Sequence, residues 1–244
     1  MRKVLATLVC VVLVMTMFGC TRKTDSSSAS SASSSQSAAS SAESAKPVEL
    51  PKPKDLEVIE SGWSVNSSGY IQYGIGIKNP NADFEAKLFT VTASGKDPAG
   101  RILFSEYMVV GSVPPNSEYY FGAQIGNGAR PSHVEFIVSV SDDNWVPREK
   151  IKKSPTFEIT STNVVPGNFN MTSFTGEITA KGEDTKVNGV WISVILRNKE
   201  NKIVGGYYSF TDIARLNQKY PFEVRVFDPV EYETYKLYAY SYNG

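Results

Sequence analysis

Cysteine and histidine are almost absent from this chain, which has two cysteines and one histidine in 244 residues. Cys10 lies in an apolar N-terminal run of the kind that is removed on secretion, so Cys20 is the only thiol expected in the exported part. The exported part can therefore build neither a disulfide nor a His/Cys metal cluster or catalytic triad. His133 comes directly after a turn at 130–132 and is expected at the surface.

Long hydrophobic runs are also scarce. The run from Val4 to Met17 comes after a positively charged start at Arg2 and Lys3. A helix needs roughly 20 apolar residues to span a bilayer, so this shorter run predicts a secretory signal over residues 1–19 rather than a permanent membrane helix.

The signal ends in Met17-Phe18-Gly19-Cys20, which resembles the lipobox of bacterial lipoproteins. The resemblance implies cleavage between Gly19 and Cys20, a diacylglyceryl group on the Cys20 thiol and a further acyl chain. Two buried chains give lasting attachment where one gives only reversible binding. An ordinary secretory signal cut nearby is the alternative. We expect an extracytoplasmic protein held on the bacterial cell membrane by a lipid on Cys20.

An excess of charge of either sign is lacking too. The chain has 25 basic and 25 acidic residues, and removal of Arg2 and Lys3 leaves 25 − 2 = 23 basic residues. This balance gives no electrostatic footprint for nucleic acid.

Serine dominates the segment after the lipobox, with 12 of the 19 residues from Ser26 to Ser44. Such a composition offers nothing to bury, and the prolines at 47, 51 and 53 favour an extended backbone in the residues just after it. Residues 20–54 are therefore predicted to be a disordered tether.

The rest of the chain repeats itself at a constant offset of 101 residues, without gaps. Tyr73 and Ile77 fall on Phe174 and Ile178, and the Tyr-x-Phe pattern at Tyr119 recurs at 220. The repeat predicts two modules, at 55–141 and 156–244, joined by a linker at 142–155.

Each module alternates apolar and polar residues with period two between turns rich in Asn, Pro, Asp and Gly. No segment has the pattern of a long amphipathic helix. Several short strands in about 90 residues predict an all-β fold of two tandem immunoglobulin-like antiparallel β-sandwich domains, with a small barrel as the alternative.

The segment from Leu196 to Gly205 resembles the hairpin of the FxLYD-type modules of bacterial surface proteins, and 100–103 is its counterpart in the first module. The Phe-x-Leu-Tyr-Asp string itself is absent. The resemblance implies extracellular, non-enzymatic adhesion or scaffold modules.

The types of side chain indicate two candidate binding sites. The oxygen-bearing side chains of Asp142, Asp143 and Asn144 in the linker suit Ca²⁺, although a solvated linker needs no metal. Tyr238, Tyr240 and Tyr242 are expected on the outer face of the last strand, where they could bind a sugar or a partner protein or simply pack across strands.

No catalytic residue is assigned, and no enzyme is expected. The leading hypothesis is a lipid-anchored surface protein with non-catalytic binding, adhesion or scaffold modules, whose partners are the membrane and a cell-envelope glycan or surface protein. The alternatives are a solute- or glycan-binding accessory lipoprotein and a hydrolase that uses paired carboxylates, which would need two acids in one pocket.

Overall fold

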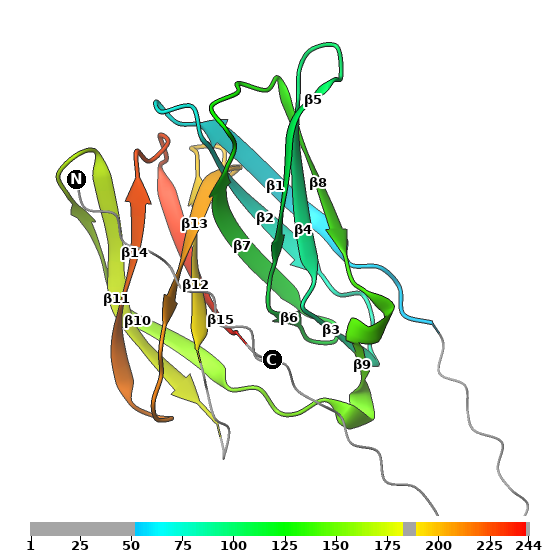
Figure 1. The fold of residues 1–244 in the computed structure, drawn as a ribbon. Coiled ribbons are helices and arrows are strands. Elements are labelled where there is room, and N and C mark those ends of the chain that lie inside the picture. Colours follow the sequence, from blue (N-terminus) through cyan, green and yellow to red (C-terminus); the bar gives the residue numbers. More distant parts are fainter. Residues whose placement is uncertain (1–51, 183–188, 243–244) are drawn as a thin grey trace, which may run out of the picture. The chain divides into compact units, whose positions relative to one another are not determined.

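The computed structural model describes residues 52–182 and 189–242, and this part of the chain is all-β (Figure 1). Its strands pair antiparallel throughout, and two short 3₁₀ turns are its only helical segments. The predicted fold class is confirmed. The predicted signal peptide, Cys20 and the tether up to residue 51 lie outside the described residues. No helix in 52–182 or 189–242 combines the length and the apolar character that a membrane crossing needs.

The first module has two main sheets and one small sheet. The sheet β1-β2-β7 faces the sheet β5-β4-β8, and β6-β3-β9 closes one end. Its strands are β1 (Glu57–Val65), β2 (Ile71–Lys78), β3 (Phe84–Lys87), β4 (Thr90–Lys96), β5 (Ile102–Val109), β6 (Ser112–Val113), β7 (Glu118–Ile125), β8 (His133–Ser139) and β9 (Trp145–Pro147).

The second module repeats the two main sheets, as β10-β11-β14 and β13-β12-β15. Its strands are β10 (Thr156–Pro166), β11 (Met171–Lys181), β12 (Val190–Arg197), β13 (Ile203–Thr211), β14 (Lys219–Phe227) and β15 (Thr234–Ser241).

Strand pairing obeys the 101-residue offset seen in the sequence. Val65 pairs with Ile71 in the first hairpin, and Pro166 pairs with Thr172 in the second. The side-chain period of a strand is two, so a shared register places equivalent residues on equivalent faces. This is why the core positions repeat: Tyr73 and Phe174 are both fully buried.

The predicted linker contains more structure than a simple connection. Its first residues form a 3₁₀ turn, η1 (Asp142–Asn144), and β9 then pairs with β3 of the first module. A second 3₁₀ turn, η2 (Arg148–Lys150), precedes β10. Part of the segment at 142–155 therefore belongs to the small sheet of the first module.

The two modules belong to one compact unit. The sheet β13-β12-β15 lies against the outer face of β1-β2-β7, and β13 contacts all three strands of that sheet (Figure 1). Every residue of β2 except Lys78 is buried, because one face of the strand packs in the first module's core and the other on the second module.

A row of three glycines makes this contact close. Gly62, Gly74 and Gly122 are paired with one another across β1, β2 and β7. A Cβ at Gly62 would lie 1.8 Å from the Ile203 carbonyl oxygen, and one at Gly122 would lie 2.5 Å from the Tyr207 nitrogen. The β13 backbone thus runs along a groove that exists only because these positions have no side chain.

We expect Gly62→Ala to lower the free energy of unfolding by about 1–3 kcal/mol, because the added methyl group meets backbone that cannot rotate away. Thermal denaturation measures the change. Gly189→Ala is the matched control, since a Cβ there would make only ordinary contacts at 3.7 Å and beyond. Equal losses in the two variants would show that β13 does not lie in the glycine groove.

Candidate functional site

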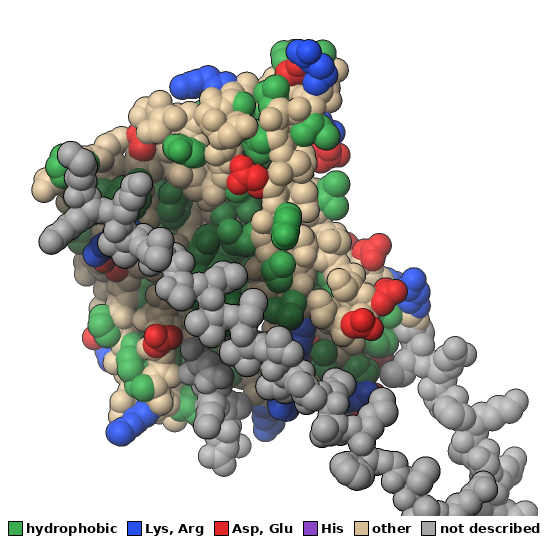
Figure 2. Space-filling model, in the orientation of Figure 1, with side chains coloured by type: hydrophobic (Ala, Val, Ile, Leu, Met, Phe, Trp, Pro, Cys, Tyr) green, Lys and Arg blue, Asp and Glu red, His purple; other side chains and the backbone are tan. Residues whose placement is uncertain are grey.

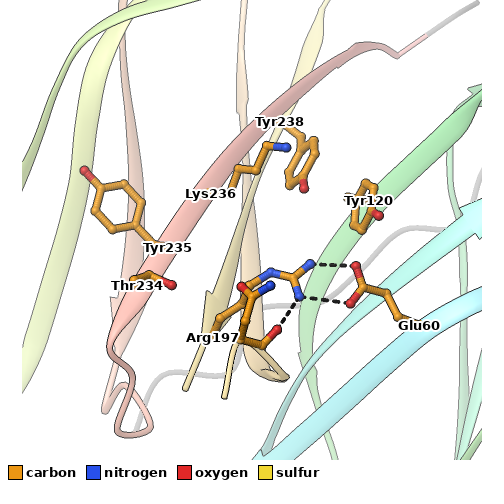
Figure 3. A pocket seen from close by; sticks show the side chains of 8 residues that line it. Glu60, Tyr120, Arg197, Thr234, Tyr235, Lys236 and Tyr238 are labelled. Carbon is orange, nitrogen blue, oxygen red and sulfur yellow. Dashed lines mark hydrogen bonds and ion pairs between the residues drawn. The ribbon is translucent and has the colours of Figure 1, made fainter. Parts of the chain in front are cut away.

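A polar cleft of about 440 Å³ opens where the two modules meet (Figure 3). The first module contributes side chains from β1 and β7. The second contributes the end of β12, the β12–β13 turn and the start of β15. The lining residues are Glu60, Tyr120, Arg197, Asn201, Thr234, Tyr235, Lys236 and Tyr238.

An ion pair between the modules forms one wall of the cleft. The Arg197 guanidinium donates to both oxygens of Glu60, with Nη2–Oε1 at 2.6 Å and Nη1–Oε2 at 2.9 Å. Nη1 also donates to the Asn201 carbonyl oxygen at 2.8 Å. This forked geometry is the strong form of a charge-assisted hydrogen bond.

The hydrogen bonds from Arg197 lower the pKa of Glu60, against the opposing effect of partial burial, and the same bonds raise the pKa of Arg197. Glu60 is therefore a carboxylate at neutral pH and has no proton to give. The cleft's single described carboxylate is thus engaged in holding the modules together, and it is poorly suited to the general-acid role that the hydrolase alternative requires.

An aromatic pair forms the other wall. The rings of Tyr120 and Tyr238 are stacked, with centroids 4.5 Å apart and planes 15° from parallel. The Lys236 ammonium nitrogen lies 4.9 Å from the centroid of the Tyr238 ring, within the range of a cation–π contact. Lys236 is exposed, so the cleft presents an accessible cation beside phenol and amide groups.

Tyr238 and Tyr240 of β15 point away from the core of their own module, as the alternation predicted. Tyr240 stacks on Tyr119 at a centroid distance of 3.8 Å, and its hydroxyl accepts a hydrogen bond from the Tyr120 N–H at 2.8 Å. Tyr242, which follows the end of β15, packs near Trp191 of its own module at 5.9 Å. This face of β15 therefore contacts the first module through Tyr240, and of the three tyrosines only Tyr238 lines the cleft. Ligand binding by all three stays a prediction.

Gln72 forms a second polar link between the modules, one that the sequence did not indicate. The fully buried Gln72 amide donates to the carbonyl oxygens of Phe227 and Asp228 at 3.0 and 2.9 Å, and its oxygen accepts from the Val230 N–H at 3.2 Å. The one signal available was a side-chain amide in a strand whose other residues before Lys78 are aliphatic, aromatic or glycine.

Asp142, Asp143 and Asn144 lie together in η1, whose turn is closed by backbone hydrogen bonds from Asn144 N–H to Ser141 and from Trp145 N–H to Asp142. Within residues 52–182 and 189–242, no three His, Cys, Asp or Glu side chains are grouped closely enough to hold a metal ion. Calcium binding at this turn stays a prediction. His133 begins β8 and is exposed.

No protein-family model matches this chain, and no curated protein matches it in sequence.

We expect Glu60→Gln to lower the free energy of unfolding at neutral pH by about 1–2 kcal/mol, because Arg197 then loses its charged partner. The pKa of Glu60 is lowered from its ordinary 4.5, so the stabilisation is present above pH 4.5 and is lost as the pH falls below it. The gap between the wild type and the variant, measured by denaturant titration at several pH values, should close on acidification.

Glu135→Gln is the matched control. Glu135 pairs with Lys96 on exposed surface within the first module. Its replacement should change stability much less, because solvent screens the pair. A Glu60→Gln loss that is no larger, or that does not shrink in acid, would contradict an ion pair that ties the modules together.

Proposed function

We propose that this protein is a lipid-anchored extracytoplasmic protein of the bacterial cell membrane, whose two modules bind or hold partners without catalysing a reaction. The lipobox-like segment ending at Cys20 supports the membrane-anchored location. The hairpin at 196–205, which resembles FxLYD-type modules, supports the assignment to non-catalytic binding modules. The expected partners are the membrane, through the lipid, and a cell-envelope glycan or surface protein.

One observation carries the proposal: the two modules are joined as one body. The glycine row, the Arg197–Glu60 pair and the Gln72 hydrogen bonds each join the first module to the second. A substrate-gripping enzyme or solute-binding protein commonly opens and closes between its domains. Two modules fixed face to face instead suit a scaffold that presents its outer surfaces in constant geometry.

The cleft favours a second candidate function, binding of a glycan or small solute. Its volume of about 440 Å³ is that of a small-molecule site. Asn201 and Thr234 contribute polar groups to its lining, and Lys236 lies over the Tyr238 ring. Titration calorimetry with soluble cell-wall saccharides would test it. A heat of binding that is seen with the wild type and is absent with Lys236→Ala, at unchanged thermal stability, would support binding in the cleft.

Cys20→Ala should move the protein from the detergent phase to the aqueous phase in a detergent phase-separation assay of whole cells, or leave it unprocessed, because Cys20 is the only thiol expected in the exported part. Cys10→Ala is the control and should remain with the detergent. A mature Cys20→Ala protein that still partitions into detergent would refute the lipid anchor.

If Asp142, Asp143 and Asn144 bind Ca²⁺, millimolar calcium should raise the melting temperature above that in chelator, since a ligand of the folded state stabilises it by mass action. Differential scanning calorimetry gives the answer. Identical curves in the two buffers, or an equal rise in Asp142→Asn/Asp143→Asn, would dismiss this site.

A further inference from the structure

The end of the hairpin formed by β10 and β11 is unusual in being both fully exposed and uncharged. Residues 161–170 are all exposed, which places the last part of β10 and the turn outside the core (Figure 1). No charged residue occurs from Ile159 to Gly176, although charged residues make up 20% of the chain. We call residues 161–171 the hairpin tip.

Phe169 is at the centre of this tip. Its side chain is 97% exposed, more than any other large hydrophobic residue described. Its backbone φ is +57°, in the left-handed region that aromatic residues rarely adopt, and Asn170 comes next at +54°. Neither packing nor local backbone preference accounts for a phenylalanine here. An apolar ring held in water by an unfavourable backbone indicates a functional constraint.

The tip is also held in place. The Gly167 N–H donates to the Met171 carbonyl oxygen at 2.7 Å, and the Asp228 N–H donates to the Asn170 carbonyl oxygen at 2.7 Å. The Asn170 amide donates in turn to the Asp228 carboxylate. That carboxylate also accepts hydrogen bonds from the Ser67 hydroxyl at 2.7 Å and the Ser68 N–H at 2.9 Å, so the first module braces the loop.

Other exposed apolar side chains lie on the sheet where the tip begins. Met171 and Phe227 are paired across β11 and β14, and they share the outer face of the sheet with Val165. Phe227 and Val165 are 55% and 48% exposed. Figure 2 shows hydrophobic side-chain atoms at this upper-left end of the molecule. Residues 161–171 therefore form a small projection that carries no charge of its own. The nearest charged groups are the Asp228 carboxylate, which is bonded to Asn170, and Arg225, which is paired with Ser173.

We propose that the hairpin tip inserts Phe169 into the surface of the lipid bilayer to which the protein is anchored. This proposal rests on the lipid anchor at Cys20. An apolar projection gains by entering the boundary between headgroups and acyl chains, whereas an anionic partner would need cationic side chains, of which residues 161–171 have none.

The tether is long enough for this contact. Lys54 is bonded to Asn81 at the start of the first module, and β1 runs from there to the Ser67–Ser68 turn that braces the tip. The tip thus lies roughly 30 Å from the point where the tether arrives, the length of nine residues in a strand. The 35 residues from 20 to 54 can extend to about 120 Å.

Anchoring also makes a weak contact sufficient. One phenylalanine binds a bilayer poorly from solution, but an anchored protein is held at a high effective concentration beside the surface. Insertion would then fix which face of the two-module block points outward, which attachment at Cys20 alone cannot do.

The test uses the lipidated full-length chain in vesicles of phosphatidylcholine and phosphatidylglycerol, with and without brominated lipid, a quencher of tryptophan in the membrane. Phe169→Trp places the reporter at the tip. Tyr107→Trp is the matched control, since Tyr107 is 74% exposed on β5 of the first module. After subtraction of the wild-type emission, the tip tryptophan should be blue-shifted and quenched, and the control tryptophan should not.

A second measurement is independent of the anchor. The chain from residue 20 with Cys20→Ser should bind such vesicles weakly, and Phe169→Asn should reduce its partition coefficient about tenfold, with little effect of salt. Asparagine tolerates a positive φ, so this variant should keep its melting temperature and isolate the loss of the ring.

The outcomes separate the two proposals. If the lipidated protein does not float with vesicles, the lipid anchor is refuted. The partition coefficients of the unlipidated chain with and without Phe169→Asn then still test whether the tip enters the bilayer. If it floats but the Phe169→Trp emission is quenched no more than that of Tyr107→Trp, the tip does not enter the bilayer. Loss of capture of an envelope protein by Phe169→Asn, with unchanged vesicle binding, would likewise overturn insertion in favour of a protein contact.

Discussion

The close approach of two backbones, made possible by three missing side chains, determines how this molecule is organised. Gly62, Gly74 and Gly122 form a straight row across one sheet, and the β13 backbone lies on it. A β-sheet face usually meets its neighbour through side chains about 10 Å deep. Removal of those side chains along one row brings the sheets close enough for peptide groups of different modules to touch.

Several polar contacts depend on that approach. Arg197 ends β12 and reaches Glu60 on β1, and Gln72 on β2 reaches the backbone at 227–230. Each of these groups is partly or fully removed from water, so each would be costly if its partner were displaced. The glycine row thus sets the distance, and the hydrogen bonds fix one orientation at that distance.

The sequence predicted the fold because the two repeats agree wherever they build their own cores. Tyr73 and Phe174, and likewise Phe121 and Phe222, occupy the same inward positions and are buried in both modules. Alternation with period two and turn residues at matching offsets therefore sufficed to place the strands.

The interface could not be predicted in that way because it is built from positions at which the repeats differ. Gly74 and Gly122 stand opposite Thr175 and Glu223 in the other repeat, and Tyr240 stands opposite Ser139. A comparison that looks for similarity passes over such positions. Glycines in mid-strand are a signal for close backbone approach, yet the sequence does not say which backbone approaches.

These same differences determine where the stacking of sheets ends. The contact between the modules joins the outer face of one repeat to the opposite outer face of the next, which in identical repeats could continue into an open chain of molecules. At the free end of the second module, Asn163, Thr175 and Glu223 occupy the three glycine positions. Their side chains would hold an approaching strand away.

The first module's free sheet carries Thr90 and Ser139 where the second has Trp191 and Tyr240, so it also lacks the aromatic surface that fills the contact. Each repeat therefore has only one of the two complementary surfaces, and the stacking of modules ends with two.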